Sequence, residues 1–415
     1  MFRLCSKLAV IFILASLINI SSGQVTYLDQ GIYRVLYRMG RLAVFNSVGF
    51  TGIEKKYFRV NKARNKLQKQ FSKDDPFFCD PQGPGRRSDQ VPESVHKLRP
   101  GDIDIIGAIG DSLTAGNGAM ATNIPQVTME NKGMSGLVGG QGTWRQFLTI
   151  PNILKVYNPN LYGYSLRDSL SILPESKFNV AEIGAMSRDT PYQAYNLLKR
   201  MRSDNRVNMK RHWKLITYLI GSNDFCADIC YQKDPADSVK KHKKEMIKTL
   251  RILKDNFPRT MVQVIATPSL EFLLKFRGTP PICILTHMVE CPCLFSLQRE
   301  SLLKLYIRIM EAWKKVEEEV VNREEFHNKP DFSVNFNPFS DQIFIPTTRS
   351  GKTDFTYMSM DCFHFSQKGY AMASNALWNN MMEPFNNKSH IWKKEFEEFK
   401  CPTEEQPFLT TKMNS

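Results

Sequence analysis

Three short stretches of the chain carry residues that could together cleave an ester bond. Gly-Asp-Ser-Leu at residues 110–113 and Gly-Ser-Asn-Asp at 221–224 each follow an apolar run, and Asp-Cys-Phe-His occupies 361–364. A serine becomes a nucleophile when a base lies beside it, and the base works best when a carboxylate orients it. The three stretches therefore predict acyl transfer with Ser112 as nucleophile, His364 as general base and Asp361 as the orienting carboxylate.

Each of these residues also has a plain structural interpretation. A serine after a strand often caps a helix, an asparagine often ends a strand in a turn, and a lone histidine is more often structural than catalytic. Among the 7 histidines, only His364 has an aspartate three residues before it in such a stretch. We therefore expect structural roles for the other six: His96, His212, His242, His287, His327 and His390.

The elements that would position these residues alternate between apolar strands and helical patterns. Strands are predicted at 103–109, 178–181, 215–220, 261–266 and near 332–334, each of them short and mainly apolar, and the first is rich in β-branched residues. Helices are predicted at 240–257, along a stripe from 302 to 316, and at 370–381. This alternation is typical of a parallel sheet covered on both faces, with polar residues at the carboxyl ends of the strands.

The first residues of the chain predict secretion. Residues 1–23 contain two cations, an apolar core at 8–20 and small residues at the end, which is the pattern of a signal peptide with Gln24 as the mature start. A buried N-terminal helix is the alternative. No second apolar run approaches 18 residues, so we expect no transmembrane anchor and an extracellular protein. Asn-Lys-Ser at 387–389 fits the N-glycosylation pattern.

The cysteines fit an oxidising compartment. Of 9 cysteines, Cys5 falls in the signal peptide, which leaves 9 − 1 = 8. An even set in a secreted chain predicts disulfides, and we expect Cys226 to pair with Cys230. Metal binding around Cys291 and Cys293 is the competing interpretation, although their spacing matches no usual zinc pattern.

The net charge of +15 favours anionic partners. Nucleic acid is not expected, because the chain has no nucleic-acid-binding motif and carries a secretory signal. An anionic membrane surface is the better candidate, and basic residues at 55–73 could form an amphipathic helix lying on it; a solvated extension packed on the main domain is the alternative. Residues 24–91 thus form a basic extension that ends in a linker at 79–92.

Two further segments are expected to border the site. The glycine-rich stretch at 133–142 lacks the ending of a phosphate-binding loop and is interpreted as a flexible rim of the cleft. The apolar, cysteine-bearing segment at 280–295 could cover or line an acyl-chain site, and core packing is equally compatible with its composition.

The order Ser, Gly, Asn, then a closely spaced Asp and His resembles the SGNH/GDSL hydrolase family. Within it, the animal phospholipase B type is the most similar, through stretches that run from Val-His-Lys-Leu-Arg-Pro-Gly-Asp-Ile at 95–103 to Cys-Pro-Thr at 401–403. The resemblance covers residues from about 92 to the C-terminus. It departs from the family at Ser222, where a second glycine is expected, and in having neither a membrane anchor nor tandem domain repeats.

The resemblance implies a three-layer α/β/α domain at 92–400 with a mostly parallel five-stranded sheet, followed by a C-terminal tail at 401–415. It also implies an oxyanion hole made by Ser112, Gly184 and Asn223, and no metal or organic cofactor. The expected substrates are glycerophospholipids and lysophospholipids. The alternatives are a carboxylesterase acting on short-chain or carbohydrate esters and a catalytically inactive lipid-binding protein. The sequence sets no oligomeric state.

Overall fold

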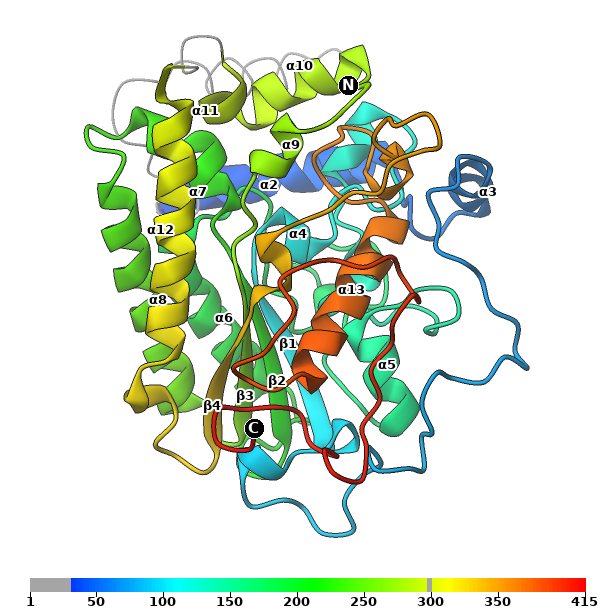
Figure 1. Cartoon of the computed structure of the whole chain (residues 1–415), viewed down its shortest axis with the longest axis vertical. Helices are drawn as coiled ribbons and strands as arrows, with labels where there is room; N and C mark the ends of the chain where they lie inside the picture. Colours follow the sequence, from blue (N-terminus) through cyan, green and yellow to red (C-terminus); the bar gives the residue numbers. More distant parts are fainter. Residues whose placement is uncertain (1–30, 297–300) are drawn as a thin grey trace.

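The computed structural model describes residues 31–296 and 301–415, so the predicted signal peptide at 1–23 lies outside the described residues. Its centre is a parallel sheet with the strand order β1-β2-β3-β4 (Figure 1). The strands are β1 (Ile103–Gly110), β2 (Trp213–Leu219), β3 (Thr260–Ile265) and β4 (Phe332–Asn337). The predicted α/β fold is confirmed, with one correction: the described residues form four strands rather than five.

The missing fifth strand is the one predicted at 178–181. This segment does run parallel to β1, because the Ala108 N–H donates to the Phe178 carbonyl at 3.0 Å and the Val180 N–H donates to the Ala108 carbonyl at 3.1 Å. The side chain of Asn179, however, accepts from the Ala181 N–H and donates to the Thr114 carbonyl. Such local side-chain bonds compete with a regular ladder, so only an isolated bridge remains.

Helices cover both faces of the sheet. Ile105 and Ile109 of β1 face α6 (Thr190–Ser203) and α8 (Asp237–Asn256), together with the end of α12 (Leu303–Val321). Ile106 and Ala108 face the other way, toward α5 (Ile150–Tyr157) and α13 (Gln367–Met382). The remaining helices are α2 (Gly31–Val48), α3 (Lys55–Ala63), α4 (Ser112–Ala115), α7 (Ser222–Ala227), α9 (Glu271–Leu274), α10 (Pro281–Glu290) and α11 (Pro292–Phe295).

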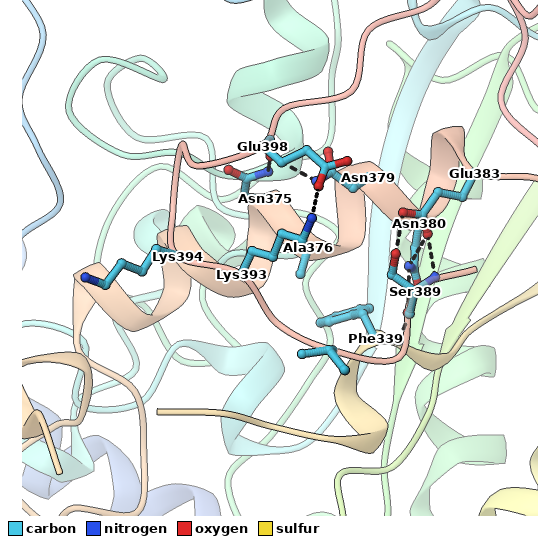
Figure 2. Close-up of a pocket in the computed structure, with 11 residues that line it drawn as sticks. Phe339, Asn375, Ala376, Asn379, Asn380, Glu383, Ser389, Lys393, Lys394 and Glu398 are labelled. Carbon is cyan, nitrogen blue, oxygen red and sulfur yellow. Dashed lines mark hydrogen bonds and ion pairs between the residues drawn. The ribbon is translucent and has the colours of Figure 1, made fainter. Parts of the chain in front are cut away.

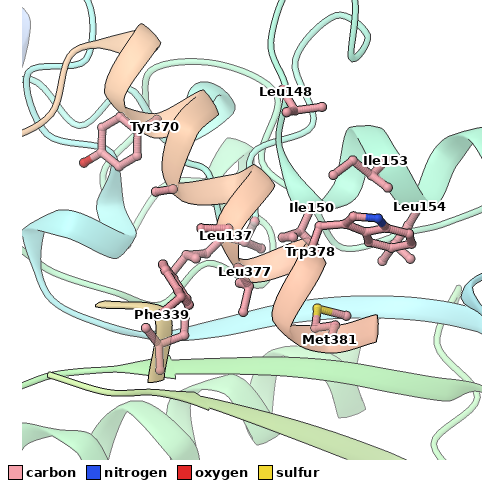
Figure 3. Packing of buried hydrophobic residues seen from close by; sticks show 14 of the residues in the cluster. Leu137, Leu148, Ile150, Ile153, Leu154, Phe339, Tyr370, Leu377, Trp378 and Met381 are labelled. Atoms are coloured by element: carbon pink, nitrogen blue, oxygen red, sulfur yellow. The ribbon is translucent and has the colours of Figure 1, made fainter. Parts of the chain in front are cut away.

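The last helix lies in the middle of one core. Every residue of α13 is buried, which fits a helix packed on all sides rather than on one stripe. Figure 3 shows Leu377, Trp378 and Met381 of this helix among side chains of α5 and of the segment before it. Because α13 begins three residues after His364, this packing fixes where the His364 loop joins the core.

The extension before the sheet packs on the rest of the chain. The ring of Phe58 on α3 lies 5.8 Å from that of Phe147, and Leu67 joins the same cluster. A disulfide between Cys79 and Cys401 ties the extension to the C-terminal tail. Phe58 of α3 is thus packed on the rest of the chain, as expected for a packed extension, while Val60 on the same helix is 37% exposed.

The predicted pairing of Cys226 with Cys230 is wrong. Cys226 bonds to Cys291 and Cys230 bonds to Cys293, while Cys283 bonds to Cys362. Cys226 lies on α7, which ends at Ala227, whereas Cys230 lies on the separate 3-10 turn Ile229–Tyr231, so the two cysteines do not share a helix. The two cysteines therefore reach a common partner segment, and the metal interpretation of Cys291 and Cys293 is wrong as well.

The interpretation of 133–142 as a flexible rim is also wrong, because residues 133–140 are buried. The Gly140 N–H donates to the Ser165 carbonyl at 2.7 Å, and a Cβ on Gly140 would come within 2.1 Å of the Tyr164 ring. Glycine is thus required by close packing rather than by mobility. Within 31–296 and 301–415, none of the helices combines the length and hydrophobicity that crossing a bilayer takes.

Candidate active site

Ser112 begins the short helix α4 directly beyond the carboxyl end of β1. Asp111 caps this helix through its Oδ1, which accepts from the Leu113 N–H at 2.9 Å. The turn is tight: a Cβ on Gly110 would lie 2.5 Å from the Leu219 carbonyl oxygen of β2. The sheet edge therefore fixes the serine, which is only 4% exposed.

His364 lies between Ser112 and Asp361. Its Nε2 is 2.8 Å from the Ser112 Oγ, and its Nδ1 is 2.6 Å from the Asp361 Oδ2. A carboxylate only accepts hydrogen bonds, so Nδ1 carries a proton, and in the neutral ring Nε2 can accept the serine proton. The three residues predicted from the sequence are thus brought together in hydrogen-bond order.

The charges of this group are set by burial and by each other. Burial alone would lower the pKa of His364, but the Asp361 carboxylate, with Glu290 and Asp111 nearby, raises it to about 9. For Asp361 the effect of burial has the opposite direction and would raise the pKa, yet the charge and hydrogen bonds of His364 hold that pKa below its usual range. The pair therefore favours an imidazolium beside a carboxylate, the charge state that follows proton transfer from a serine.

The loop that carries Asp361 and His364 is held from several directions. Cys362 has a φ of 56°, in the left-handed region that non-glycine residues seldom adopt. The Ser359 Oγ donates to the Gly118 carbonyl at 2.6 Å. The Lys66 ammonium donates to the Met358 and Ser359 carbonyls, and burial lowers the pKa of Lys66 to about 8.

The other two predicted residues follow the neighbouring segments at the same sheet edge. Asn223 lies on α7, which follows β2, and Gly184 follows the segment that pairs with β1 on its other side. A hydrogen bond joins Asn223 to the residue after Gly184: the Asn223 Nδ2 donates to the Ala185 carbonyl at 2.9 Å. Gly184 is exposed with a φ of 76°, and a Cβ there would meet nothing within 4 Å. An open position of this kind can be approached by a ligand.

Glu290 is the residue at this site that the sequence analysis missed. It ends α10, and its carboxylate lies with Asp361 and His364 in a group whose ligating atoms are all within 4.8 Å of one another. Burial, followed by the charge of Asp361, raises the pKa of Glu290 to about 8. Nothing in its sequence neighbourhood marks it, because it reaches the site only through the fold.

The other six histidines have the structural roles expected of them. His242 is buried, stacks on Trp313 with ring centroids 4.0 Å apart, and contacts the Ser187 hydroxyl. His287 contacts the Cys362 carbonyl at 3.0 Å. The remaining four contact other groups through a ring nitrogen: His96 with Thr411, His212 with Asn208, His327 with Val321 and His390 with Asp341.

A separate hollow beside α13 contains none of the predicted site residues. Figure 2 shows its polar lining, in which Asn375 and Asn379 donate to the Glu398 carbonyl and Ser389 donates to Glu383. These bonds join the C-terminal tail region to α13. The polar groups of this hollow are therefore used for structure.

Comparison with known proteins points to one family. The family model described as GDSL-like Lipase/Acylhydrolase matches residues 106–377. Phospholipase B1, membrane-associated, from Rattus norvegicus is 36% identical over 342 residues, which cover 82% of this chain and 23% of that protein. Its Homo sapiens counterpart is 35% identical over 337 residues, covering 80% and 22%. The chain thus spans less than a quarter of the length of these relatives.

A crystal structure of a candidate GDSL-like lipase from Parabacteroides merdae aligns with 66% of this chain and 92% of its own, with 14% identity and a TM-score of 0.31. A likeness that weak carries no argument about this chain. The match to the family model covers more than half of the sequence, and the relatives are more than 30% identical over most of it. The chain belongs to the GDSL-like lipase/acylhydrolase family, a family of ester hydrolases.

Proposed function

We propose that this protein is a secreted serine esterase that hydrolyses the acyl ester bonds of glycerophospholipids and lysophospholipids. The observation that carries the proposal is the continuous line of hydrogen bonds from Ser112 through His364 to Asp361. The lipid substrate rests on the similarity to mammalian phospholipase B1. In this proposal residues 1–23 are a cleaved signal peptide, 24–91 the extension, 92–400 the catalytic domain and 401–415 its tail.

The proposed reaction proceeds through an acyl-enzyme. The Ser112 oxygen attacks the ester carbonyl carbon while His364 takes its proton on Nε2, and Asp361 stabilises the imidazolium. The tetrahedral intermediate then collapses, the carbon–oxygen bond to the glycerol breaks, and His364 returns the proton to the departing alcohol. Water attacks the acyl-enzyme in the same way and releases the fatty acid.

The negative oxygen of each tetrahedral intermediate needs hydrogen-bond donors. We assign the Ser112 N–H, the Gly184 N–H and the Asn223 amide to this oxyanion hole. The amide of Asn223 has two N–H groups, and the bond to Ala185 occupies one, so the second can serve the substrate. Donors held in place before the reaction stabilise the transition state without reorganisation.

Lipid analysis tests this function. Purified protein is incubated with a mixed lipid extract, and the products are identified by mass spectrometry, with Ser112→Ala as the matched inactive control. Release of free fatty acid with lysophospholipid or glycerophosphodiester by the wild type alone supports the proposal. Cleavage of short acyl esters with phospholipids left intact points instead to a carboxylesterase. Binding without any turnover points to an inactive lipid-binding protein.

The proposed chemistry is completed by side chains and backbone N–H groups, so we expect no metal requirement. Activity is measured on a soluble ester before and after treatment with EDTA, with calcium added back. Equal rates are expected. A loss that calcium restores would contradict the proposed mechanism.

A further inference from the structure

Helix α10 shows its apolar side chains to solvent and turns its polar ones inward, the reverse of an ordinary surface helix. Val289 is 73% exposed, Leu285 58% and Ile284 54%, and Ile282 and Met288 also count among the exposed hydrophobics. Their spacing of three and four residues places them on one side of the helix. Soluble proteins seldom keep such a contiguous apolar surface unless something covers it.

The inward side of α10 is fastened to the loop that carries Asp361 and His364. Cys283 is bonded to Cys362, and the Thr286 hydroxyl donates to the Asp361 carbonyl at 2.8 Å. His287 contacts the Cys362 carbonyl at 3.0 Å. The helix is therefore a rigid outer layer over the reacting groups. Figure 1 places it at the top of the molecule, beyond α4 and the carboxyl ends of the strands.

Two exposed cations lie in and beside the segment that leads into α10. Arg277 is exposed four residues before α10 begins, and its backbone N–H donates to the Thr353 hydroxyl. The exposed Lys352 precedes Thr353 in the chain, and its side chain packs against Gly278, two residues before Pro280. The helix itself has no lysine or arginine, and its one carboxylate, Glu290, faces the catalytic loop. An uncharged apolar centre with a basic border matches the acyl region and the phosphates of a phospholipid surface.

We propose that the exposed face of α10 (Ile282, Ile284, Leu285, Met288 and Val289), with Arg277 and Lys352 at its border, docks the enzyme on the surface of aggregated phospholipid. The inference rests on the proposed lipid esterase function. A second copy of the chain fits this surface poorly, since a stable protein interface takes about 20–30 residues from each partner and α10 offers five exposed apolar side chains. Docking there holds the catalytic loop next to the lipid that supplies substrate.

Partition onto vesicles tests the inference separately from catalysis. Ser112→Ala protein, alone and with Leu285→Ser and Val289→Ser added, is sedimented with phosphatidylcholine vesicles containing phosphatidylglycerol. We expect the double change to lower the partition coefficient about tenfold or more, because two exposed apolar side chains no longer enter the membrane. Val91→Ser is the control, because Val91 is 49% exposed and far from α10. It precedes Pro92, whose carbonyl accepts from the indole N–H of Trp213 at the amino end of β2, whereas α10 lies beyond the carboxyl ends of the strands.

In the active enzyme, the same double change is expected to lower hydrolysis of vesicles about tenfold and to leave hydrolysis of a soluble short-chain ester unchanged. Equal vesicle binding by the α10 variant and the Val91 control would overturn the inference. So would a change in oligomeric state without lipid, measured by sedimentation velocity, since the face would then join two copies. If α10-dependent binding persists but no lipid is cleaved, the proposed function fails and the docking surface stands.

Discussion

The proposed nucleophile and the proposed base of this site are held in place by different means. Ser112 follows β1, and β1 is paired along its length with β2 and sits between two layers of helices. Asp361 and His364 lie on an irregular loop that is closed by an isolated bridge between Met358 and Phe365 and does not belong to the sheet. That loop is held by a disulfide to Cys283, by the Lys66 ammonium and by the packing of α13.

This difference predicts how each half responds to change. The apolar residues of β1 belong to the hydrophobic core, so alterations of the apolar side chains that support Ser112 should reduce folding stability and activity together. A loop held by individual ties can lose one of them while the core remains intact, so alterations there should reduce activity more than stability. Variants in each half can test this contrast.

The largest effect is expected where the two halves meet. Ser112→Ala and His364→Ala should each lower kcat on a soluble ester by about 10⁴ to 10⁶, and the double variant should lose no more than either single one. Ser112→Ala removes only a hydroxyl, so its thermal melting should shift little, whereas His364→Ala leaves the buried Asp361 carboxylate without its partner and should lower the melting temperature. A double variant that loses the product of the two single effects would show that the residues act independently.

A smaller loss is expected from the segment next to the serine. Asn223→Ala removes one proposed oxyanion donor and should lower kcat by about 10² to 10³ with KM nearly unchanged. The same change also breaks the bond to the Ala185 carbonyl, so Asn223→Asp, which keeps the size but not the donor, is the companion variant. Unchanged turnover in Asn223→Ala would remove this residue from the oxyanion hole.

Two disulfides allow a test of whether a tie to the loop affects activity more than a tie elsewhere in the chain. Cys283→Ala with Cys362→Ala releases α10 from the catalytic loop and should lower kcat roughly tenfold, because the loop carrying His364 loses a tie. Loss of either disulfide should lower the free energy of unfolding, typically by about 2–4 kcal/mol. Cys79→Ala with Cys401→Ala, however, should leave kcat unchanged at 25 °C, because that bridge does not hold the loop. Stability is measured by denaturant unfolding. Equal kcat in both variants would contradict the proposed role of the tie.

The half built on the sheet could be predicted from the sequence. The residue pattern predicts the apolar strands before Ser112 and before Asn223. Neighbouring parallel strands bring their carboxyl ends together however the side chains pack, so the two residues were expected at one end of the sheet. The prediction of a fifth strand at 178–181 was wrong because the Asn179 side chain accepts a hydrogen bond from the Ala181 N–H, which a regular strand would use in its ladder. Strand propensity does not tell whether such a side-chain hydrogen bond is more stable than the backbone hydrogen bonds of a strand pair.

The supports of the loop half could not be predicted. Eight cysteines allow many pairings, and only the fold brings Cys291 and Cys293 to their partners Cys226 and Cys230. The glycines at 133–140 signal mobility by composition, yet they serve close packing. Lys66 and Glu290 reach the loop from distant parts of the chain, and each looks like an ordinary surface charge in its own neighbourhood.

The smallest effect concerns Glu290, and it appears only at alkaline pH. The proposed mechanism requires His364 in its neutral form, and that form becomes populated as the pH rises through the raised pKa of His364, about 9. The pKa of Glu290 is about 8, so at pH 7 its carboxyl is mostly protonated and Glu290→Gln changes little. We expect kcat at pH 7 within about threefold of the wild type.

Above pH 8 the two enzymes should separate. There the wild-type Glu290 ionises, and its negative charge favours the protonated His364, whereas glutamine exerts no such effect. In Glu290→Gln the rise of kcat/KM on a soluble ester should therefore occur at lower pH than in the wild type. Glu319→Gln is the control, because Glu319 pairs with Lys243 away from the loop and should leave the profile unchanged. Superimposable profiles for all three proteins would mean that Glu290 does not influence the proton on His364, and a loss above 100-fold at pH 7 would make Glu290 a required group rather than a modulator.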